Sequence, residues 1–237
     1  MSDTTYSFSK IKLAKFCPYK YKLIYVDKIK EEANLPVIFG SAIHELFKDI
    51  IVNNLDRKKA LGLWKRYFKD KAVEFESGED LTIRANEKDD FWIGKGFPAI
   101  QLFYKNKDNL NIKEVKYAEK LMESEYDGKK FRFIVDLIYE DNSKRIVLLD
   151  YKTGKNKKED YLQTQFYSEL IDLNVDSIYL YYIFSGIEIF SPGKYREEVK
   201  KYINEGIDLI ESKNYHKNVS DNCKKCFFYQ KECNIKN

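Results

Sequence analysis

Two apolar segments joined by a short polar turn occupy the middle of the sequence, and each carries an aspartate. The first, KFRFIVDLIYE (130–140), has Asp136 inside its apolar run, and the second, RIVLLDYK (145–152), ends in Asp150 and Lys152. Because side chains alternate along a strand, Asp150 and Lys152 share one face. If the polar residues between the segments form a hairpin turn, the two aspartates come close together.

Two carboxylates in one place call for a cation. Each raises the other's pKa unless a positive charge lies between them, and an unpaired buried carboxylate is costly. Mg²⁺ accepts one or two carboxylates together with waters and phosphate oxygens. Lys152 would face the same space and could orient or deprotonate a water or stabilise charge on a phosphate. The alternative is a solvated lysine at a strand end, but an aspartate within an apolar strand favours the metal site.

The surrounding elements predict an α/β fold with a mixed sheet, because helices are followed by three consecutive strands, a helix and a strand. Asp127-Gly128 indicates a hairpin turn, Ser9 is the expected N-cap of the first helix, and Cys17-Pro18 is expected to break that helix. Helices are expected at 8–26 (with that break), 41–55, 57–75, 87–107, 158–174 and 195–212. Strands are expected at 113–126, 130–140, 145–152, 177–184 and 186–190.

Length and composition set broad limits. The 237 residues, 43% hydrophobic and 34% charged, fit one large domain or two small ones. The net charge of +4 says little about partners. The opening MSDTTYSFSK has no apolar signal segment, and no stretch approaches a membrane span. We therefore expect a cytoplasmic protein without membrane contact, in which disulfides are disfavoured.

The four cysteines then need another role. Cys17 lies near the beginning, and Cys223, Cys226 and Cys233 lie near the end in CKKCFFYQKEC. C-x-x-C is a metal-ligand spacing, and four thiolates make a full ligand set for zinc or for an iron–sulfur cluster. Chance cysteines in an exposed tail and a redox C-x-x-C are the alternatives. Spacing alone does not separate zinc from a cluster.

Two further segments hold candidate site residues. FGSAIHE contains Gly40 and His44, and His44 lies beside the apolar stripe of its helix, so the residues alone favour a core or boundary histidine. YLQTQFYSEL places Gln163 and Tyr167 on one helix face, which an ordinary amphipathic helix also explains.

A basic run follows the second aspartate strand. Its candidate DNA-binding residues are Lys155, Lys157 and Lys158. Such a run is usually a solvated loop, but beside a metal site it would attract a phosphate backbone. The sequence has no zinc-finger or helix-turn-helix pattern, which predicts little sequence specificity. It has no Walker motif, so ATP-driven unwinding would require another subunit.

Asp136 followed by Asp150-Tyr151-Lys152 resembles the signature of the PD-(D/E)XK nucleases, and within them the chain is similar to the RecB-like branch. The resemblance implies a restriction-endonuclease-like core in which Asp136 and Asp150 are metal ligands, Tyr151 belongs to the metal-binding set and Lys152 is the catalytic lysine. The branch often has a glycine where this chain has Phe133.

Other motifs resemble the same branch. The Gly-x-x-x-His pattern implies His44 as a metal ligand from the helix that faces the sheet. The Gln-x-x-x-Tyr pattern implies that Gln163 and Tyr167 lie beside the catalytic centre and the substrate DNA. Related nucleases also place an acidic residue upstream of the first aspartate. The candidates for it are Glu119 and, as alternatives, Glu114, Glu123 and Glu125.

The cysteines also fit this resemblance. RecB-like nucleases with an iron–sulfur cluster carry one cysteine before the nuclease core, in a CPxKY-like stretch, and three after it. FSKIKLAKFCPYKY has that form. The CRISPR-associated adaptation nucleases, the AddB subunit and exonuclease V are members of this group. The resemblance implies a 4Fe-4S cluster on Cys17, Cys223, Cys226 and Cys233 that joins the N- and C-terminal segments, with zinc as the alternative.

We therefore expect one nuclease domain over 1–237, with a helical part at 8–107, a catalytic core at 113–190 and a cysteine-bearing part at 195–237 that Cys17 completes. The expected activity is a Mg²⁺- or Mn²⁺-dependent deoxyribonuclease that acts as an exonuclease on single-stranded DNA ends. The expected settings are DNA repair or recombination, phage DNA processing or CRISPR adaptation, with a helicase or CRISPR adaptation proteins as candidate partners. The alternatives are a catalytically silent DNA-binding or assembly subunit and an iron–sulfur electron-transfer protein.

Overall fold

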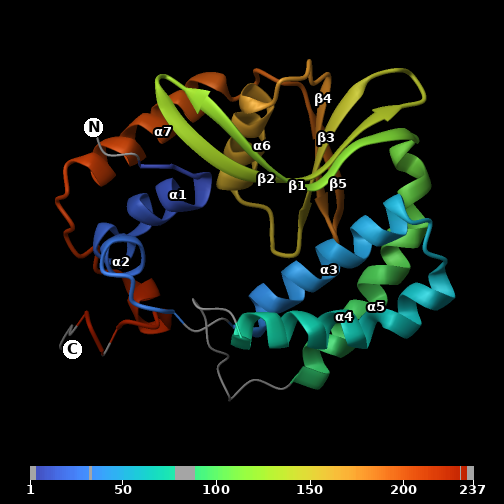
Figure 1. The fold of residues 1–237 in the computed structure, drawn as a ribbon, viewed down its shortest axis with the longest axis horizontal. Coiled ribbons are helices and arrows are strands. Elements are labelled where there is room, and N and C mark those ends of the chain that lie inside the picture. The colour runs from blue at the N-terminus through green and yellow to red at the C-terminus, as the bar shows by residue number, and fades with distance from the viewer. Residues whose placement is uncertain (1–3, 32–33, 78–88, 230, 234–237) are drawn as a thin grey trace.

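A five-stranded mixed sheet forms the centre of the computed structural model, which describes residues 4–31, 34–77, 89–229 and 231–233 (Figure 1). The strands lie in sequence order across the sheet. They are β1 (Ile112–Tyr126), β2 (Lys129–Asp141), β3 (Ile146–Lys152), β4 (Ser177–Tyr182) and β5 (Gly186–Phe190). β3 and β4 run parallel and the other neighbours are antiparallel. The α/β class with a mixed sheet is confirmed.

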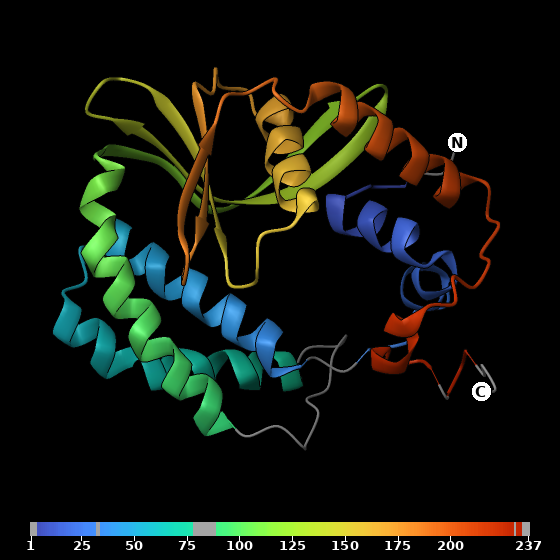
Figure 2. The same ribbon diagram turned by 180° about the vertical axis from the view of Figure 1, so that it is seen from behind.

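Helices cover both faces of the sheet (Figures 1 and 2). On one face, α3 (Leu35–Val52), α4 (Arg57–Ser77) and α5 (Asp89–Asn106) enclose the first core. On the other, α1 (Phe8–Phe16), α6 (Lys158–Leu170) and α7 (Arg196–Glu211) enclose the second core. The short helices are α2 (Pro18–Tyr21), η1 (Lys22–Val26), η2 (Lys107–Leu110) and η3 (Asp221–Lys225). None of the helices in the described ranges is both long and apolar enough to cross a membrane.

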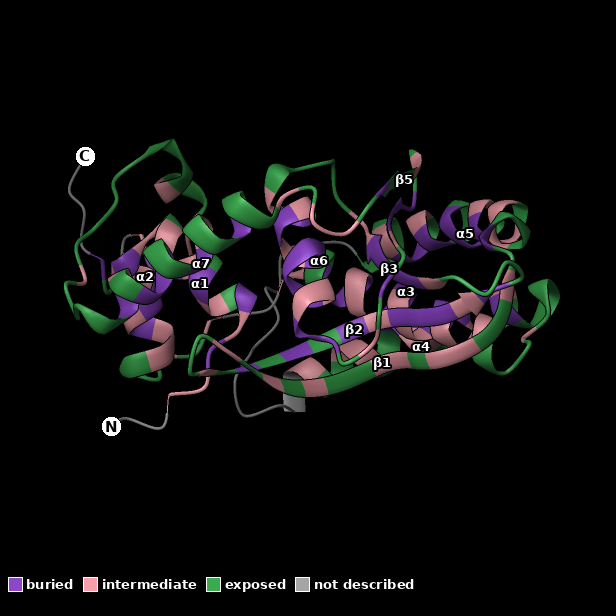
Figure 3. Cartoon of the chain, turned by 90° about the horizontal axis from the view of Figure 1, so that it is seen from above, coloured by how far each residue is buried: buried purple, intermediate pink, exposed green. Residues whose placement is uncertain are grey.

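The β1–β2 hairpin reaches beyond the rest of the sheet toward α1 and α7 (Figures 1 and 2). Asp127 and Gly128 both have positive φ, as the expected tight turn requires. Near this turn Tyr6 lies along β2: its N–H donates to the Lys130 carbonyl over 2.8 Å, and its carbonyl accepts from the Arg132 N–H over 2.9 Å. Figure 3 shows that β1, the edge strand, is largely exposed or half-buried, whereas β2 beside it holds most of the buried positions.

The turn between β2 and β3 is fixed by Asp141. Its Oδ1 accepts from the N–H groups of Ser143 over 2.8 Å and Arg145 over 2.9 Å, and its Oδ2 pairs with the Arg145 guanidinium. This turn sets the register that pairs Leu137 with Leu149. The expected hairpin between the two aspartate strands is confirmed.

The first helices differ in detail from the sequence expectation. The N-cap of α1 is Ser7, whose Oγ accepts from the Lys10 N–H over 3.2 Å, so the expectation of Ser9 was wrong. The break at Cys17-Pro18 is confirmed. α3 begins at Leu35, earlier than expected, because the Asn34 side chain caps it. The run before residue 41 is apolar enough to be buried and so continues the helix.

Other boundaries differ as well. α3 ends at Val52, three residues before the expected end, and α4 continues to Ser77. Residues 87 and 88 lie outside the described ranges, and α5 is described from Asp89. α6 ends at Leu170 and β4 at Tyr182, each shorter than expected. The glycine at 96 in α5 has a packing reason: a Cβ there would lie 2.0 Å from the Trp64 ring.

A third, small core brings the two ends of the chain together. It consists of Leu23, Phe228 and Cys233 with several half-buried neighbours. The Tyr19 N–H donates to the His216 carbonyl over 3.1 Å, so the segment after α1 is also tied to the segment after α7 by the main chain.

Candidate active site

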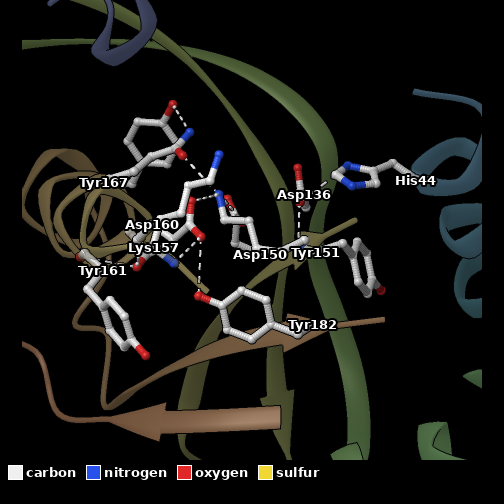
Figure 4. A network of polar contacts seen from close by, with 12 residues as sticks. His44, Asp136, Asp150, Tyr151, Lys157, Asp160, Tyr161, Tyr167 and Tyr182 are labelled. Carbon is white, nitrogen blue, oxygen red and sulfur yellow. Dashed lines mark hydrogen bonds and ion pairs between the residues drawn. The ribbon is translucent and has the colours of Figure 1, made fainter. Parts of the chain in front are cut away.

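The β2–β3 ladder ends where the candidate carboxylates begin. Its last rung joins Leu137 to Leu149. Beyond this rung, a side chain takes the place of the backbone acceptor. The Tyr151 N–H of β3 donates to the Asp136 Oδ2 of β2 over 2.7 Å (Figure 4). β3 continues beside β4 as far as Lys152. The Asp136 carboxylate is therefore held at the point where two strands separate.

Glu119 lies opposite Asp136 on β1 and has a left-handed backbone, with φ of 45°. A non-glycine residue in this conformation within a strand is strained, and such residues concentrate at functional sites. The alternation of side chains along β2 is irregular near this position. Val135 and Ile138 of β2 both pack into the second core, although regular alternation would put residues three apart on opposite faces.

The irregularity brings three potential metal ligands together. Ligand atoms of His44, Glu119 and Asp136 lie within 4.8 Å of one another. His44 Nδ1 is 3.4 Å from Asp136 Oδ2 and 3.8 Å from Glu119 Oε1. Glu119 Oε1 is buried and has no hydrogen-bond partner among the residues that the structure describes. An imidazole with two carboxylates is a donor set that Mn²⁺ or Mg²⁺ accepts.

The pKa values in this group reflect charged groups that lie close together in a half-buried site. Burial, and then the charge of Asp136, raises the pKa of Glu119 to about 7. Burial disfavours the charged form of His44, but its neighbouring carboxylates outweigh burial and raise the pKa of the imidazole. Burial also opposes ionisation of Asp136, yet His44 and Lys152 lower the pKa of that carboxyl. Bound cations relieve this kind of crowding.

Asp150 and Lys152 lie on the second-core side of β3, as the alternation predicted. Their side chains form an ion pair, with Lys152 Nζ 2.7 Å from Asp150 Oδ2. Burial raises the pKa of Asp150 to about 6 although the lysine opposes the shift. The Lys152 ammonium loses hydration, but Asp150 outweighs this loss and raises the lysine pKa to about 12. The ammonium thus stays protonated in this arrangement.

Helix α6 fixes the other side of Lys152. Lys152 Nζ donates to Gln163 Oε1 over 2.9 Å, and Gln163 Nε2 donates to the Tyr167 hydroxyl over 3.0 Å. Gln163 and Tyr167 do share a helix face, and that face is turned to the lysine. The chain of contacts therefore runs from Asp150 through Lys152 and on to Tyr167 of α6. Figure 4 labels the two ends of this chain, Asp150 and Tyr167.

Asp160 is a neighbour that the sequence did not single out. It is buried, its Oδ1 lies 3.8 Å from Lys152 Nζ, and its Oδ2 accepts from the Tyr182 hydroxyl and the Lys157 N–H, each over 3.2 Å. The spacing could have revealed it, because a residue three before Gln163 lies on the same helix face.

The remaining predicted residues fall in different surroundings. The Tyr151 ring points into the first core against Phe47, so only its N–H reaches Asp136. Asp150 lies outside the group of three clustered ligands and contacts Lys152 instead. The predicted DNA-binding lysines are exposed on the loop after β3 and the start of α6. They are Lys155, Lys157 and Lys158.

The candidate for an upstream acidic residue can now be chosen by geometry. Glu119 reaches the ligand group, whereas Glu123 pairs with Arg132 and Glu114 pairs with Lys116 on the outside of the sheet. A groove of about 440 Å³ opens over His44, Glu119 and Asp136 and extends to Gln163 and Tyr167. Its polar centre is where a substrate could contact these side chains.

Comparison with known proteins agrees with this geometry. The model of the PD-(D/E)XK nuclease superfamily matches residues 5–231. The chain belongs to the PD-(D/E)XK nuclease superfamily. A solved structure from Eubacterium rectale, named "putative exonuclease", has a TM-score of 0.57 at 14% identity and covers 99% of this chain and 90% of its own. A second, named SSO0001, has a TM-score of 0.38 at 17% identity, with 93% of each chain covered. No curated protein matches the chain.

In this nuclease, Phe133 occupies the position where the RecB-like branch often has a glycine. Its ring packs on Tyr167 with the centroids 4.9 Å apart. The larger side chain therefore supports the α6 residue that holds Gln163, and the sheet–helix contact is kept.

The four cysteines of the nuclease are free thiols that line one small cavity beside the third core. Cys17 lies between α1 and α2, and Cys223, Cys226 and Cys233 come from the segment after α7. Burial raises the pKa of the Cys233 thiol, and the other three sulfurs act in the same direction. Within the described residues, no three of these sulfurs lie within 4.8 Å of one another. A single tetrahedral zinc ion would bring its sulfurs closer than that, to about 3.8 Å for Zn–S bonds of about 2.3 Å.

Proposed function

We propose that this nuclease hydrolyses phosphodiester bonds of DNA with the help of Mg²⁺ or Mn²⁺, and that it acts on the ends of single strands. The observation that carries the proposal is the meeting of two groups at one break in the sheet. His44, Glu119 and Asp136 cluster on one side, and the Asp150–Lys152 pair lies on the adjoining strand.

The residues present fit a divalent metal. His44, Glu119 and Asp136 would hold it, and Asp150 would join them from β3. The buried Glu119 oxygen that lacks a hydrogen-bond partner among the described residues supports this assignment, because such an atom is costly unless a cation or donor meets it. When bound, the metal would supply Lewis acidity toward phosphate oxygens and lower the pKa of a water.

Lys152 has a separate task in the proposal. Asp150 and Gln163 hold its ammonium from two sides, so its N–H groups are fixed in direction. A fixed ammonium can orient the attacking water by hydrogen bonding and can stabilise negative charge as it grows on the phosphate. Asp160, which accepts from the Tyr182 hydroxyl, adds a further negative charge 3.8 Å from the ammonium.

End-directed cleavage is the finer part of the proposal. The Eubacterium rectale protein of the same fold is named a putative exonuclease, which supports action at ends. The family model spans residues 5–231, which supports one nuclease domain over the chain. DNA repair or recombination, phage DNA processing and CRISPR adaptation are the settings we propose, with a helicase or CRISPR adaptation proteins as partners.

The test is cleavage of fluorescently labelled DNA by the purified protein, with Mg²⁺, Mn²⁺ or EDTA. The proposal expects metal-dependent shortening of linear single strands, little action on circular single strands, and slower action on blunt duplex. Cleavage of circular single-stranded DNA would show that the protein is an endonuclease rather than an exonuclease. DNA binding without cleavage under any metal would favour a silent subunit, and neither binding nor cleavage would leave the electron-transfer alternative.

We also propose that Cys17, Cys223, Cys226 and Cys233 hold a 4Fe-4S cluster. All four thiols line one cavity although more than two hundred residues separate the first from the rest. A cluster is larger than one metal ion and holds its sulfurs farther apart, which agrees with sulfurs that share a cavity without touching. Iron and sulfide analysis of anaerobically purified protein tests this, and one zinc per chain would replace the cluster by zinc.

A further inference from the structure

Two exposed apolar side chains lie at the edge of the active-site groove. Leu121 of β1 and Ile134 of β2 form one rung of the ladder, and they are 51% and 50% exposed. Single exposed apolar residues are common on protein surfaces. This pair is different because its members are directly opposite each other and both line the groove that contains the clustered ligands. Together they form an apolar rim.

The rim is fixed in place relative to the ligands. Leu121 is two residues from Glu119, and Ile134 is two residues from Asp136, on the same strands. The next charged residues beside the rim on the same strands are Glu123 and Arg132. They pair with each other and leave little net charge for a phosphate. The rim therefore suits an uncharged, apolar part of a ligand.

Apart from the buried Phe133 and Tyr167, the rest of the groove is lined by polar side chains. Its remaining lining includes the hydroxyl side chains of Ser7 and Ser9 at the start of α1 and of Ser41 on α3. A nucleotide strand has the matching polarity, with apolar base faces on one side and a polar sugar–phosphate backbone on the other. In a duplex the base faces are stacked on each other, so only an unpaired base can offer its face to such a rim.

We infer that the Leu121–Ile134 rim contacts the face of the base next to the cleaved phosphate, and that this contact makes the nuclease prefer unpaired strands. The inference rests on the proposed function and names the residues that choose its substrate. Both side chains are aliphatic, so this contact acts by burying apolar surface against the face of the base. Loss of the rim should therefore weaken binding of single strands by about tenfold or more.

The test compares the double variant Leu121→Thr/Ile134→Thr with the wild type. Threonine keeps the strand propensity while removing apolar surface. The matched control is Val73→Thr on α4, which is 60% exposed and away from the groove. Binding is measured by fluorescence anisotropy in EDTA, with labelled oligothymidylate, an oligomer of abasic residues of equal length, and a duplex.

The expected result has three parts. The double variant binds oligothymidylate about tenfold or more weakly than the wild type or the control. The wild type and the double variant bind the abasic oligomer with the same weak affinity. Both bind the duplex equally. A further variant, Leu121→Phe, keeps the apolar surface and should bind oligothymidylate at least as tightly as the wild type.

Failure of this inference can be told from failure of the proposed function. If the wild type neither binds nor cleaves DNA, both are overturned. If it binds oligothymidylate and the double variant binds equally well, or if the wild type binds the abasic oligomer just as tightly, only the rim is overturned. Light scattering tests whether the rim is instead a contact between copies of the chain. A wild-type dimer that the double variant does not form, together with unchanged DNA affinity per chain, would show this and overturn the inference.

Discussion

The main-chain N–H of Tyr151 donates to the carboxylate of Asp136 where the β2–β3 ladder ends. A side chain thus takes the place of a backbone acceptor, and β2 and β3 can separate without leaving that N–H unpaired. The position of Asp136 is therefore fixed by the sheet itself. Asp150 lies beside this junction on β3, with its carboxylate paired to Lys152.

Lys152→Ala should reduce DNA cleavage by at least about 10²–10³-fold, since one fixed donor to developing charge contributes that much. It should leave the fold and Mn²⁺ binding in place, because it removes no metal ligand. Asp150→Ala should abolish cleavage as well. Rates on labelled single strands, circular dichroism and calorimetric Mn²⁺ titration check this, with Lys201→Ala on α7 as the control. A Lys152→Ala protein with near-wild-type turnover would contradict the proposed role of the ammonium.

His44→Ala should weaken Mn²⁺ binding about tenfold or more and affect DNA affinity less. Even partners that only support a metal ligand contribute 10–100-fold in affinity, so a direct ligand contributes at least that. Glu119→Gln should act in the same direction, because its buried oxygen belongs to the same group. Isothermal titration measures both, and His216→Ala is the matched control because it changes the chain's only other histidine. Unchanged Mn²⁺ affinity in His44→Ala would make His44 a structural residue of the sheet–helix boundary.

Much of this site could be predicted from the sequence because it depends on local rules. Alternation along β3 placed Asp150 and Lys152 on one face, and helical spacing placed Gln163 with Tyr167. The left-handed backbone of Glu119 could not be predicted, since nothing in the segment VKYAEKLM (115–122) marks one residue for positive φ. The choice among the four glutamates depends on that irregularity. The contact of Asp160 with Lys152 depends on how α6 is seated on the sheet.

The helix boundaries show the same limit. α5 continues through two glycines and a proline that locally disfavour a helix, because tertiary packing supports it. The reason for one glycine is visible only in the fold, where α4 brings Trp64 against position 96. Local sequence carries no record of such a contact.

That contact predicts opposite effects at two glycines of α5. Gly96→Ala should destabilise the protein by about 1–3 kcal/mol, because the new Cβ would lie 2.0 Å from Trp64. Gly94→Ala has nothing within 4 Å of its Cβ and should be neutral or stabilise the protein by up to about 1 kcal/mol through helix propensity. Urea unfolding of both variants measures the difference. Equal stability of the two would contradict the packing of α4 on α5 described above.

Asp141→Asn should lower stability at neutral pH and lose its effect in acid. The Arg145 N–H and guanidinium, with the Ser143 N–H, lower the pKa of Asp141 in the folded protein despite the cost of burial. A lowered folded-state pKa stabilises the protein above the unfolded pKa of about 3.9, and this stabilisation is lost as the pH falls through the folded value. The gap between variant and wild type should therefore be widest near pH 7 and shrink below about pH 5. Thermal unfolding across this range checks it, and a gap that widens in acid would contradict the sign.

Cys226→Ala should give colourless, less stable protein whose nuclease residues are intact. Among the described residues the third core has three buried members, so the segments around Cys17 and after α7 bury little apolar surface against each other there. Metal ligation that links such segments contributes directly to folding, and every one of the four cysteines lines the same cavity, so none is spare.

Anaerobically purified wild type should be brown and contain about four irons per chain. The measurements are visible absorption, iron content and thermal unfolding of both proteins, with Val219→Ala, at an exposed position of the segment after α7, as a control. Wild-type protein that is colourless and holds one zinc would keep the ligand set and exclude the cluster. Wild type without either metal, or a Cys226→Ala variant as stable as the wild type, would exclude a metal that joins the two ends.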